Sequence, residues 1–177
     1  MLVDTMGDDQ AIVDAARVSY GDGTQHTRNT RGLIRYLMRH GHTSPFEMCE
    51  IKFEIKTPIS VARQLVRHRA ANVNDYSGRY SIMEEDMYTP PPERLVKQSH
   101  FNKQGSSGEP VDNTIHHQET LRRANAIAQT QYNSLLDGDV ARETARSVLN
   151  LNQYTKMVWK IDLHNLLHFL QLRMDSH

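Results

Sequence analysis

The hydrophobic pattern of this chain changes its period at Cys49, and that change constrains the fold more than any other feature. Before it, apolar residues from Leu33 to Met38 recur at the spacing of a helix, and Gly41 is placed to end that helix. From Cys49 to Lys56, apolar and charged residues alternate, which is typical of a half-buried strand with one face in water. The chain therefore combines amphipathic helices with a sheet.

The rest of the chain continues this mixture. Asp8 and Asp9 are suited to cap a first helix, and Pro58 suits the first turn of a helix that delivers Arg67-His68-Arg69 at its end. Further helices are expected over about 113–136, 140–149 and 163–172, a strand over 154–161, and irregular segments over 21–27, 70–79, 90–92 and 103–110. With no internal repeat or linker, the sequence predicts a single α+β domain over residues 1–177, with helices around a small, mostly antiparallel sheet.

Charge and composition exclude several classes of protein. The 177 residues carry 21 basic and 21 acidic side chains, so the chain lacks the basic footprint of a nucleic-acid binder. No apolar run approaches the length of a membrane span, and the N-terminus has no signal-peptide pattern. The single cysteine, Cys49, suits a reducing compartment. We therefore expect a cytoplasmic protein that has neither a nucleic acid nor a membrane as partner.

The segment that most strongly indicates a binding or catalytic site is Arg67-His68-Arg69, followed after seven residues by Ser77 and then by Arg79. Several cations in so short a stretch repel one another unless an anion lies among them. The planar fork of arginine suits phosphate, and nearby short polar groups such as Asn72 and Asp75 can contact a base or a ribose. A solvated basic turn is the simpler alternative for an isolated triplet of this kind.

This spacing resembles the signature of the flavin-dependent thymidylate synthases. Further segments resemble that family in the same order: Ala15–Ser19, Leu37–Glu47, Pro58–Gln64, Val140–Leu149 and Phe169–His177. The resemblance covers nearly the whole chain, and it implies the fold of the thymidylate synthase complementing proteins. Members of that family continue with another helical segment where this sequence stops, so a C-terminal segment is expected to be missing here.

The resemblance also implies a reaction. Members of the family move a one-carbon unit from methylenetetrahydrofolate to deoxyuridylate, and FAD reduced by NADPH supplies the hydride. They are homotetramers whose active sites form between subunits. No catalytic thiol is needed, which agrees with Cys49 standing at the start of a strand without the basic setting that activates a cysteine.

Site residues follow from the resemblance, position by position. The nucleotide is expected to contact Gln64, Leu65, Val66, Arg67, Asp75, Tyr76, Ser77, Gly78, Arg79, Arg146 and Arg173, and Ser77 and Arg173 are expected to be catalytic. The flavin is expected to contact Ser19, His42, Ser44, Glu47, Arg67, His68, Arg69, Ala70, Asp75, Asp162, His164, His168 and His177. Four of these depart from the usual residues of the family: Asp75, Asp162, His164 and His168 stand where Glu, Asn, Arg and Asn are common.

Two alternative functions remain open at this point. His164 and His168 are spaced i, i+4 on an expected helix, which suits a zinc hydrolase. However, Asn165 follows His164, so the chain lacks the His-Glu-x-x-His pattern of that class, and we expect no metal site. A nucleotide- or flavin-binding homologue without turnover is the second alternative.

Overall fold

A computed structural model describes residues 1–19 and 29–174. Their contacts divide the chain into two compact units. Unit 1 consists of Met1–Lys56, Gln64–Asp75 and Lys156–His177, and unit 2 consists of Thr57–Arg63 and Tyr76–Thr155. The prediction of one domain over residues 1–177 stays a prediction. Within the described part, no helix is both long and apolar enough to cross a membrane.

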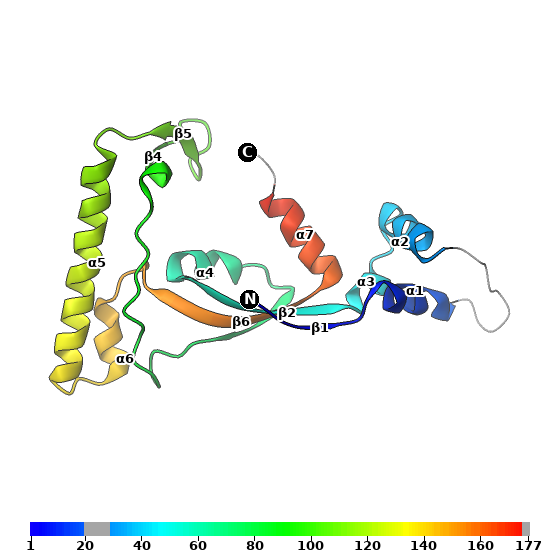
Figure 1. The fold of residues 1–177 in the computed structure, drawn as a ribbon, viewed down its shortest axis with the longest axis horizontal. Coiled ribbons are helices and arrows are strands. Elements are labelled where there is room, and N and C mark those ends of the chain that lie inside the picture. The colour runs from blue at the N-terminus through cyan, green and yellow to red at the C-terminus, as the bar shows by residue number, and fades with distance from the viewer. Residues whose placement is uncertain (20–28, 175–177) are drawn as a thin grey trace. The chain divides into compact units, whose positions relative to one another are not determined.

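Unit 1 is built on a four-stranded sheet, which Figure 1 shows as arrows. The strand order is β1 (Leu2–Met6), β2 (Glu50–Pro58), β6 (Tyr154–Asp162) and β3 (Ala71–Asp75). β1 pairs antiparallel with β2, and β3 pairs antiparallel with β6 from Ala71 opposite Ile161 to Asp75 opposite Met157. Met157, Trp159 and Ile161 alternate with more exposed residues along β6 and are almost fully buried, so one side of β6 belongs to the core.

Helices α1 (Asp9–Arg17), α2 (Thr30–Arg39), α3 (Ser44–Glu47) and α7 (Leu163–Arg173) complete unit 1. The Asp8 carboxylate accepts a hydrogen bond from the Ala11 N–H at 2.9 Å, and this contact caps α1 as the sequence predicts. The first three helices bury a common apolar cluster centred on Ile12, Leu37, Phe46 and Cys49, against which Leu163 of α7 packs. This packing sets α3 beside α7, which matters for the site below.

Unit 2 is mostly helical. Its long helix α5 (Thr114–Asp137) is followed by the short helix α6 (Arg142–Ala145) and a 3-10 turn at Arg146–Val148. The same unit holds a two-stranded ribbon of β4 (Val96–Gln98) and β5 (Ser106–Pro110), a 3-10 turn at Pro92–Arg94, and most of α4 (Ile59–Leu65). Met83, Tyr132 and Ala145 form its apolar core, which joins α5 to α6 and to the segment that follows Tyr76.

The structure confirms the α+β class and most of the expected elements. Three local predictions are wrong. The expected loop at 70–79 contains strand β3, the expected loop at 103–110 contains β5, and Pro58 is the last residue of β2 rather than part of a helix. Both missed strands are polar and exposed, and they form because a neighbouring strand offers its backbone hydrogen-bonding groups, which side-chain patterns do not report. The expected loop at 21–27 lies outside the described residues.

Candidate active site

The Ser77–Arg79 segment of unit 2 is a closed turn. The N–H groups of Tyr80 and Ser81 donate to the Ser77 carbonyl at 3.2 and 3.1 Å. The Tyr76 hydroxyl donates to the Ile82 carbonyl at 2.8 Å, and the Arg79 N–H lies 3.4 Å from Ser77 Oγ. These contacts hold the backbone of the turn in one shape, so the side chains that it carries are presented from a fixed base.

Gly78 brings this turn against Arg146. Gly78 is buried, and a Cβ at this position would lie 2.7 Å from Met83 Sδ and 3.3 Å from Arg146 Cδ. The Met83 N–H donates to the hydroxyl of buried Tyr132 at 3.0 Å, so Met83 is itself held by α5. A side chain at position 78 would therefore require Met83 and Arg146 to move away from the turn.

Residues of α6 and of the 3-10 turn after it reach the same segment. Arg142 donates to the Tyr80 carbonyl, and Glu143 pairs with Arg79 at 3.2 Å. Both partners of that ion pair are more than half exposed, so the pair contributes at most about 1 kcal/mol and an anionic ligand can replace the carboxylate. The Arg146 guanidinium has no ion-pair or hydrogen-bond partner within residues 1–19 and 29–174. Arg79, the next residue after Gly78, and Arg146, whose side chain lies against Gly78, therefore offer two guanidinium groups that suit a phosphate.

Arg67, His68 and Arg69 lie in unit 1, directly after α4. The N–H groups of Arg67 and His68 donate to the carbonyls of Gln64 and Leu65 at 3.3 and 3.1 Å, which closes a turn at the end of the helix. Arg67 and Arg69 are exposed, and neither guanidinium pairs with any side chain in the described part of the chain. Free cations at fixed backbone positions can bind a large anionic ligand.

His68 is the half-buried member of this triplet. Its ring meets Phe169 of α7 edge to face, with centroids 4.7 Å apart and planes at 86°. Its Nε2 atom lies 3.2 Å from a guanidinium nitrogen of Arg173, at the end of α7. Burial first, and then the charges of Arg173 and His168, lower the pKa of His68 below its usual value. The turn is therefore tied to α7 through a neutral imidazole.

The other expected flavin positions of unit 1 border α3 and α7. His42 and Ser44 lie at the start of α3, Glu47 lies at its end, and all three are exposed. Asp162 caps α7: its two oxygens accept from the Asn165 backbone N–H at 2.9 Å and side-chain amide at 2.7 Å. Asp162 thus has a structural role that the resemblance does not indicate.

The expected site residues divide between the two units. Unit 1 holds Ser19, His42, Ser44, Glu47, Gln64, Leu65, Val66, Arg67, His68, Arg69, Ala70, Asp75, Asp162, His164, His168 and Arg173, whereas unit 2 holds Tyr76, Ser77, Gly78, Arg79 and Arg146. His177 lies outside the described residues. Most of the expected flavin positions therefore lie in unit 1, and the turn expected to hold the nucleotide lies in unit 2.

Comparison with known proteins decides the family. The family model for thymidylate synthase complementing protein matches residues 1–177.

The chain belongs to the thymidylate synthase complementing protein family.

Two similar proteins are both named flavin-dependent thymidylate synthase. The chain is 56% identical over 178 residues to a flavin-dependent thymidylate synthase of Wolbachia pipientis wMel, and 99% of this chain matches 62% of that protein. It is also 56% identical over 173 residues to a flavin-dependent thymidylate synthase of Thermus thermophilus, where 98% of this chain matches 63% of the relative. The chain thus spans about three fifths of the length of these curated relatives.

Solved structures confirm the fold of the family. The crystal structure of a UMP/dUMP methylase, PolB from Streptomyces cacaoi bound with 5-Br dUMP, superimposes with a TM-score of 0.83 at 36% sequence identity. The comparison covers 96% of this chain and 75% of the other. The α+β fold expected from the sequence is therefore that of the thymidylate synthase complementing proteins.

Two residues that contact or support the turn were missed by the sequence prediction. Glu143 of α6 pairs with Arg79, and its signal was its position as the acidic residue between Arg142 and Arg146 in the sequence. Tyr132 supports the turn through Met83, and a single tyrosine within a long helix gives no comparable signal. The four-residue spacing of Arg142 and Arg146 predicts one shared helix face, and both residues do contact the turn.

Cys49 behaves as a structural residue of this family member. Its side chain is 5% exposed within the apolar cluster of unit 1, and its Sγ atom lies 3.7 Å from the Asp8 carbonyl. Burial, and then the charges of Asp8 and Asp9, raise the pKa of the thiol. Each of these factors disfavours the thiolate that a nucleophile needs, so the geometry does not support attack on a pyrimidine by Cys49.

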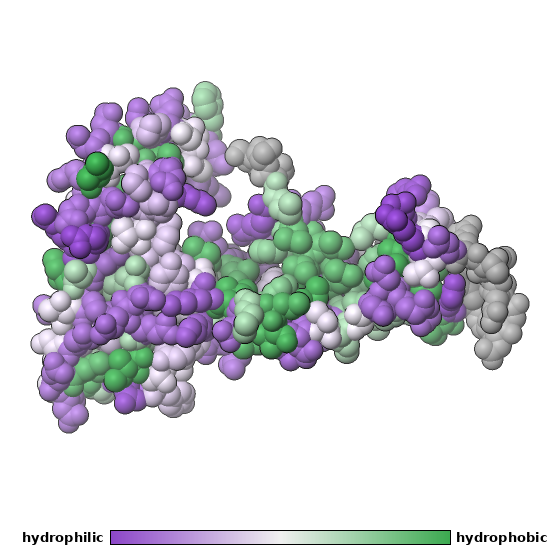
Figure 2. Space-filling model, viewed as in Figure 1, coloured by the Kyte–Doolittle hydropathy of each residue, from purple (hydrophilic) through white to green (hydrophobic). Residues whose placement is uncertain are grey.

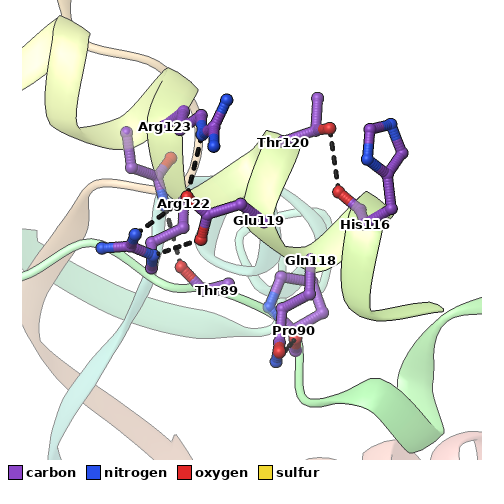
Figure 3. A network of polar contacts seen from close by, with 9 residues as sticks. Thr89, Pro90, His116, Gln118, Glu119, Thr120, Arg122 and Arg123 are labelled. Atoms are coloured by element: carbon purple, nitrogen blue, oxygen red, sulfur yellow. Dashed lines mark hydrogen bonds and ion pairs between the residues drawn. The ribbon is translucent and has the colours of Figure 1, made fainter. Parts of the chain in front are cut away.

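A separate cavity lies beside the start of α5. It has a volume of about 470 Å³ and is lined by Asn113, Thr114, Ile115, His116 and Glu119. Figure 3 shows why its one acidic side chain is not free: Glu119 accepts hydrogen bonds from Arg122 and Arg123 of the same helix. Those bonds lower the pKa of Glu119 to about 2. None of the expected site residues lines this cavity.

The spacing of His164 and His168 raises the question of a metal site. Within them, no three His, Cys, Asp or Glu side chains gather as a metal would require. His164 and His168, spaced for a metal on α7, therefore have no third ligand from this part of the chain.

Proposed function

We propose that this chain binds deoxyuridylate and FAD in an enzyme that reductively methylates deoxyuridylate to thymidylate. In this proposal methylenetetrahydrofolate donates the one-carbon unit and NADPH reduces the flavin. The observation that carries the proposal is the packing of the Arg146 side chain against Gly78, the residue before Arg79, whose only ion pair in the described residues is exposed. The names of the relatives and the bromodeoxyuridylate of the PolB structure support the same substrate.

The two arginines hold the substrate phosphate in this proposal. Arg79 exchanges the exposed carboxylate of Glu143 for the phosphate, and Arg146 brings a guanidinium that needs no exchange. A hydrogen bond between a charged donor and a charged acceptor contributes roughly 1.5–3 kcal/mol, which exceeds the contribution of the exposed ion pair that is lost. The closed backbone of the turn at Ser77 then fixes the position in which the nucleotide binds.

The residues of unit 1 fit a flavin dinucleotide. Arg67 and Arg69 offer two guanidinium groups without intramolecular partners among the described residues, which suit a pyrophosphate and an anionic isoalloxazine. Exposed His42, Ser44 and Glu47 offer shorter polar groups beside α7. When bound, the flavin supplies the hydride, and the chain's own residues bind and orient it.

Arg173 acts on the pyrimidine in this proposal. A guanidinium placed against the base stabilises negative charge that develops on the ring as C5 becomes nucleophilic. The position of Arg173 at the end of α7, with one nitrogen held by His68, supports an orienting contact of this kind. Ser77 is the second expected catalytic residue, and its position within the closed turn supports a contact with the substrate.

Three further properties belong to the proposal. We infer a homotetramer with active sites between subunits, a cytoplasmic location, and no nucleic-acid partner. Exposed leucines at positions 167, 170 and 172 of α7 support burial against another subunit, and the equal numbers of basic and acidic side chains support the absence of nucleic acid.

The proposal is tested first by absorption spectroscopy of the purified protein. A flavin spectrum that NADPH bleaches, followed by deoxyuridylate-dependent turnover of methylenetetrahydrofolate, is the expected result. A colourless protein that cannot be loaded with FAD would contradict the proposal. Bound flavin without thymidylate formation would instead indicate a homologue that binds but does not turn over.

A single substitution tests the phosphate contact. Arg79→Ala should weaken deoxyuridylate binding about tenfold or more, because one charge-assisted hydrogen bond is lost. Arg122→Ala is the matched control, since Arg122 is an exposed arginine paired with Glu119 on α5 and should leave affinity unchanged. Calorimetric titration measures both variants, and equal affinity of Arg79→Ala and the unsubstituted protein would contradict the phosphate contact.

A further inference from the structure

The contact between His68 and Arg173 restricts where the imidazole carries its proton. A guanidinium nitrogen of Arg173 lies 3.2 Å from His68 Nε2. Arginine is always protonated and can only donate hydrogen bonds. His68 Nε2 must therefore present its lone pair, which requires a neutral ring with its proton on Nδ1.

The surroundings of His68 hold the ring in this position. Its ring meets Phe169 at 4.7 Å, and Phe169 packs on Trp159 at 5.4 Å between centroids. Trp159 is 3% exposed, so the series of rings begins in the core of unit 1. The edge-to-face contact with Phe169 therefore packs the imidazole against α7, the helix that carries Arg173.

The charges that face His68 disfavour its protonation. Arg173 and His168 act on it from α7, and Arg67 and Arg69 are its neighbours in the sequence. No carboxylate contacts His68 in residues 1–19 or 29–174. An imidazolium at this position would thus meet cations and no compensating anion.

We propose that His68 is a positioning residue, whose neutral Nδ1–H form accepts a hydrogen bond from Arg173 and thereby orients that guanidinium toward the pyrimidine. The proposal rests on the proposed function, because the target of Arg173 is part of that function. Protonation of His68 replaces the hydrogen bond with repulsion and releases Arg173. His68 thus makes the orientation of Arg173 depend on pH.

The direction of the pKa shift agrees with this geometry. Burial, Arg173 and His168 lower the pKa of His68 below its ordinary value of about 6.5. As the pH falls, the unfolded chain binds the proton before the native chain does, so the contribution of His68 to stability is complete above about pH 6.5. That contribution is lost as the pH falls through the lowered native value, and the contact with Arg173 is lost with it.

Ring ¹⁵N NMR of the 177-residue chain tests the tautomer without reference to catalysis. At about pH 7.5, which lies above the ordinary pKa of histidine, we expect the signals of His68 to be those of the neutral Nδ1–H form. Arg173→Ala should raise the pKa of His68, because one cation is removed from the ring. A protonated ring or an Nε2–H tautomer at that pH would overturn the proposal.

Two substitutions of His68 test its role toward Arg173. His68→Gln places an acceptor near the position of Nε2 and cannot be protonated, whereas His68→Leu keeps bulk and removes the acceptor. At about pH 8, His68→Leu should bind deoxyuridylate about tenfold more weakly, and His68→Gln should bind within about threefold of the unsubstituted protein. Near-UV circular dichroism and flavin absorbance report whether each variant is folded and equally loaded with FAD.

The pH profile separates positioning from packing. The affinity of the unsubstituted protein for deoxyuridylate is divided by that of His68→Gln at each pH, which cancels the titration of the substrate phosphate. This ratio should fall as the pH drops below the pKa of His68. A constant ratio, or equal affinities of His68→Leu and the unsubstituted protein, would overturn the proposal. If the unsubstituted protein bound no deoxyuridylate, the proposed function would fail, and the NMR result would still decide the tautomer.

Discussion

The Asn125 network of unit 2 and the Arg67–Arg69 turn of unit 1 treat their polar groups in opposite ways. In unit 2, the buried side chain of Asn125 has every hydrogen-bonding position filled. Its amide nitrogen donates to the Tyr88 carbonyl at 3.0 Å and to Thr89 Oγ1 at 3.2 Å, and its oxygen accepts from the side-chain amides of Asn150 and Asn152 at 3.0 Å each. This network joins α5 to two segments that lack regular structure around residues 88–89 and 150–152.

The Arg67–Arg69 turn of unit 1 instead leaves cations without partners. Arg67 and Arg69 have none in the part of the chain that is described, and the pKa of His68 between them is lowered by burial and by the charges of Arg173 and His168. The surface of α7 is also apolar: Figure 2 shows hydrophobic residues gathered over this helix, while α1 and α2 are largely hydrophilic. The Asn125 network therefore stabilises the fold, whereas the exposed cations of the Arg67–Arg69 turn are available to ligands or other subunits.

The largest expected effect is on the core that supports the Ser77–Arg79 turn. Tyr132→Ala should lower the free energy of unfolding by about 3–5 kcal/mol, because Tyr132 is fully buried and its removal leaves a cavity. Tyr132→Phe keeps the ring and loses only the acceptor for the Met83 N–H, which should cost about 1 kcal/mol. Urea unfolding measures both, and a loss below about 1 kcal/mol for the alanine variant would contradict the role of Tyr132.

A smaller effect is expected in the polar network. Asn125→Ala should lower the free energy of unfolding by about 2–3 kcal/mol, because several buried amide and carbonyl groups lose their partner together. Gln131→Ala is the matched control, since Gln131 is an exposed amide on the same helix and should change stability by less than about 0.5 kcal/mol. Equal effects of the two substitutions in urea unfolding would show that the network does not stabilise unit 2.

The smallest effect on stability is expected in unit 1. Arg69→Ala should change the free energy of unfolding by no more than about 0.5 kcal/mol, because Arg69 is exposed and has no partner among the described residues. The same variant should release FAD more readily, which the flavin absorbance retained after gel filtration measures. A loss of stability above about 1 kcal/mol with normal FAD retention would break the contrast between the two units.

The sequence predicted the parts of the fold that carry a strong hydrophobic period. The alternation after Cys49 predicted β2, and the helical spacing from Leu33 to Met38 predicted α2 with its end near Gly41. It missed β1, β3 and β5, because these exposed strands are stabilised by pairing with a neighbour rather than by a buried face of their own. The motif residues of the candidate site were named from spacing and resemblance and stay a prediction, and the sequence did not indicate the contacts of Glu143 with Arg79 or of Tyr132 with Met83.

The sequence by itself determined the α+β class, the family, and the residue types at the candidate site. These properties follow from local periodicity and from motif spacing, and both depend only on the order of residues along the chain. Only the tertiary structure decided which groups have partners. Residues distant in the chain must meet before Arg146 can lie on Gly78 or Arg173 can meet His68. Because those contacts arise from packing, they separate the cations that are already paired from those that remain available to a ligand.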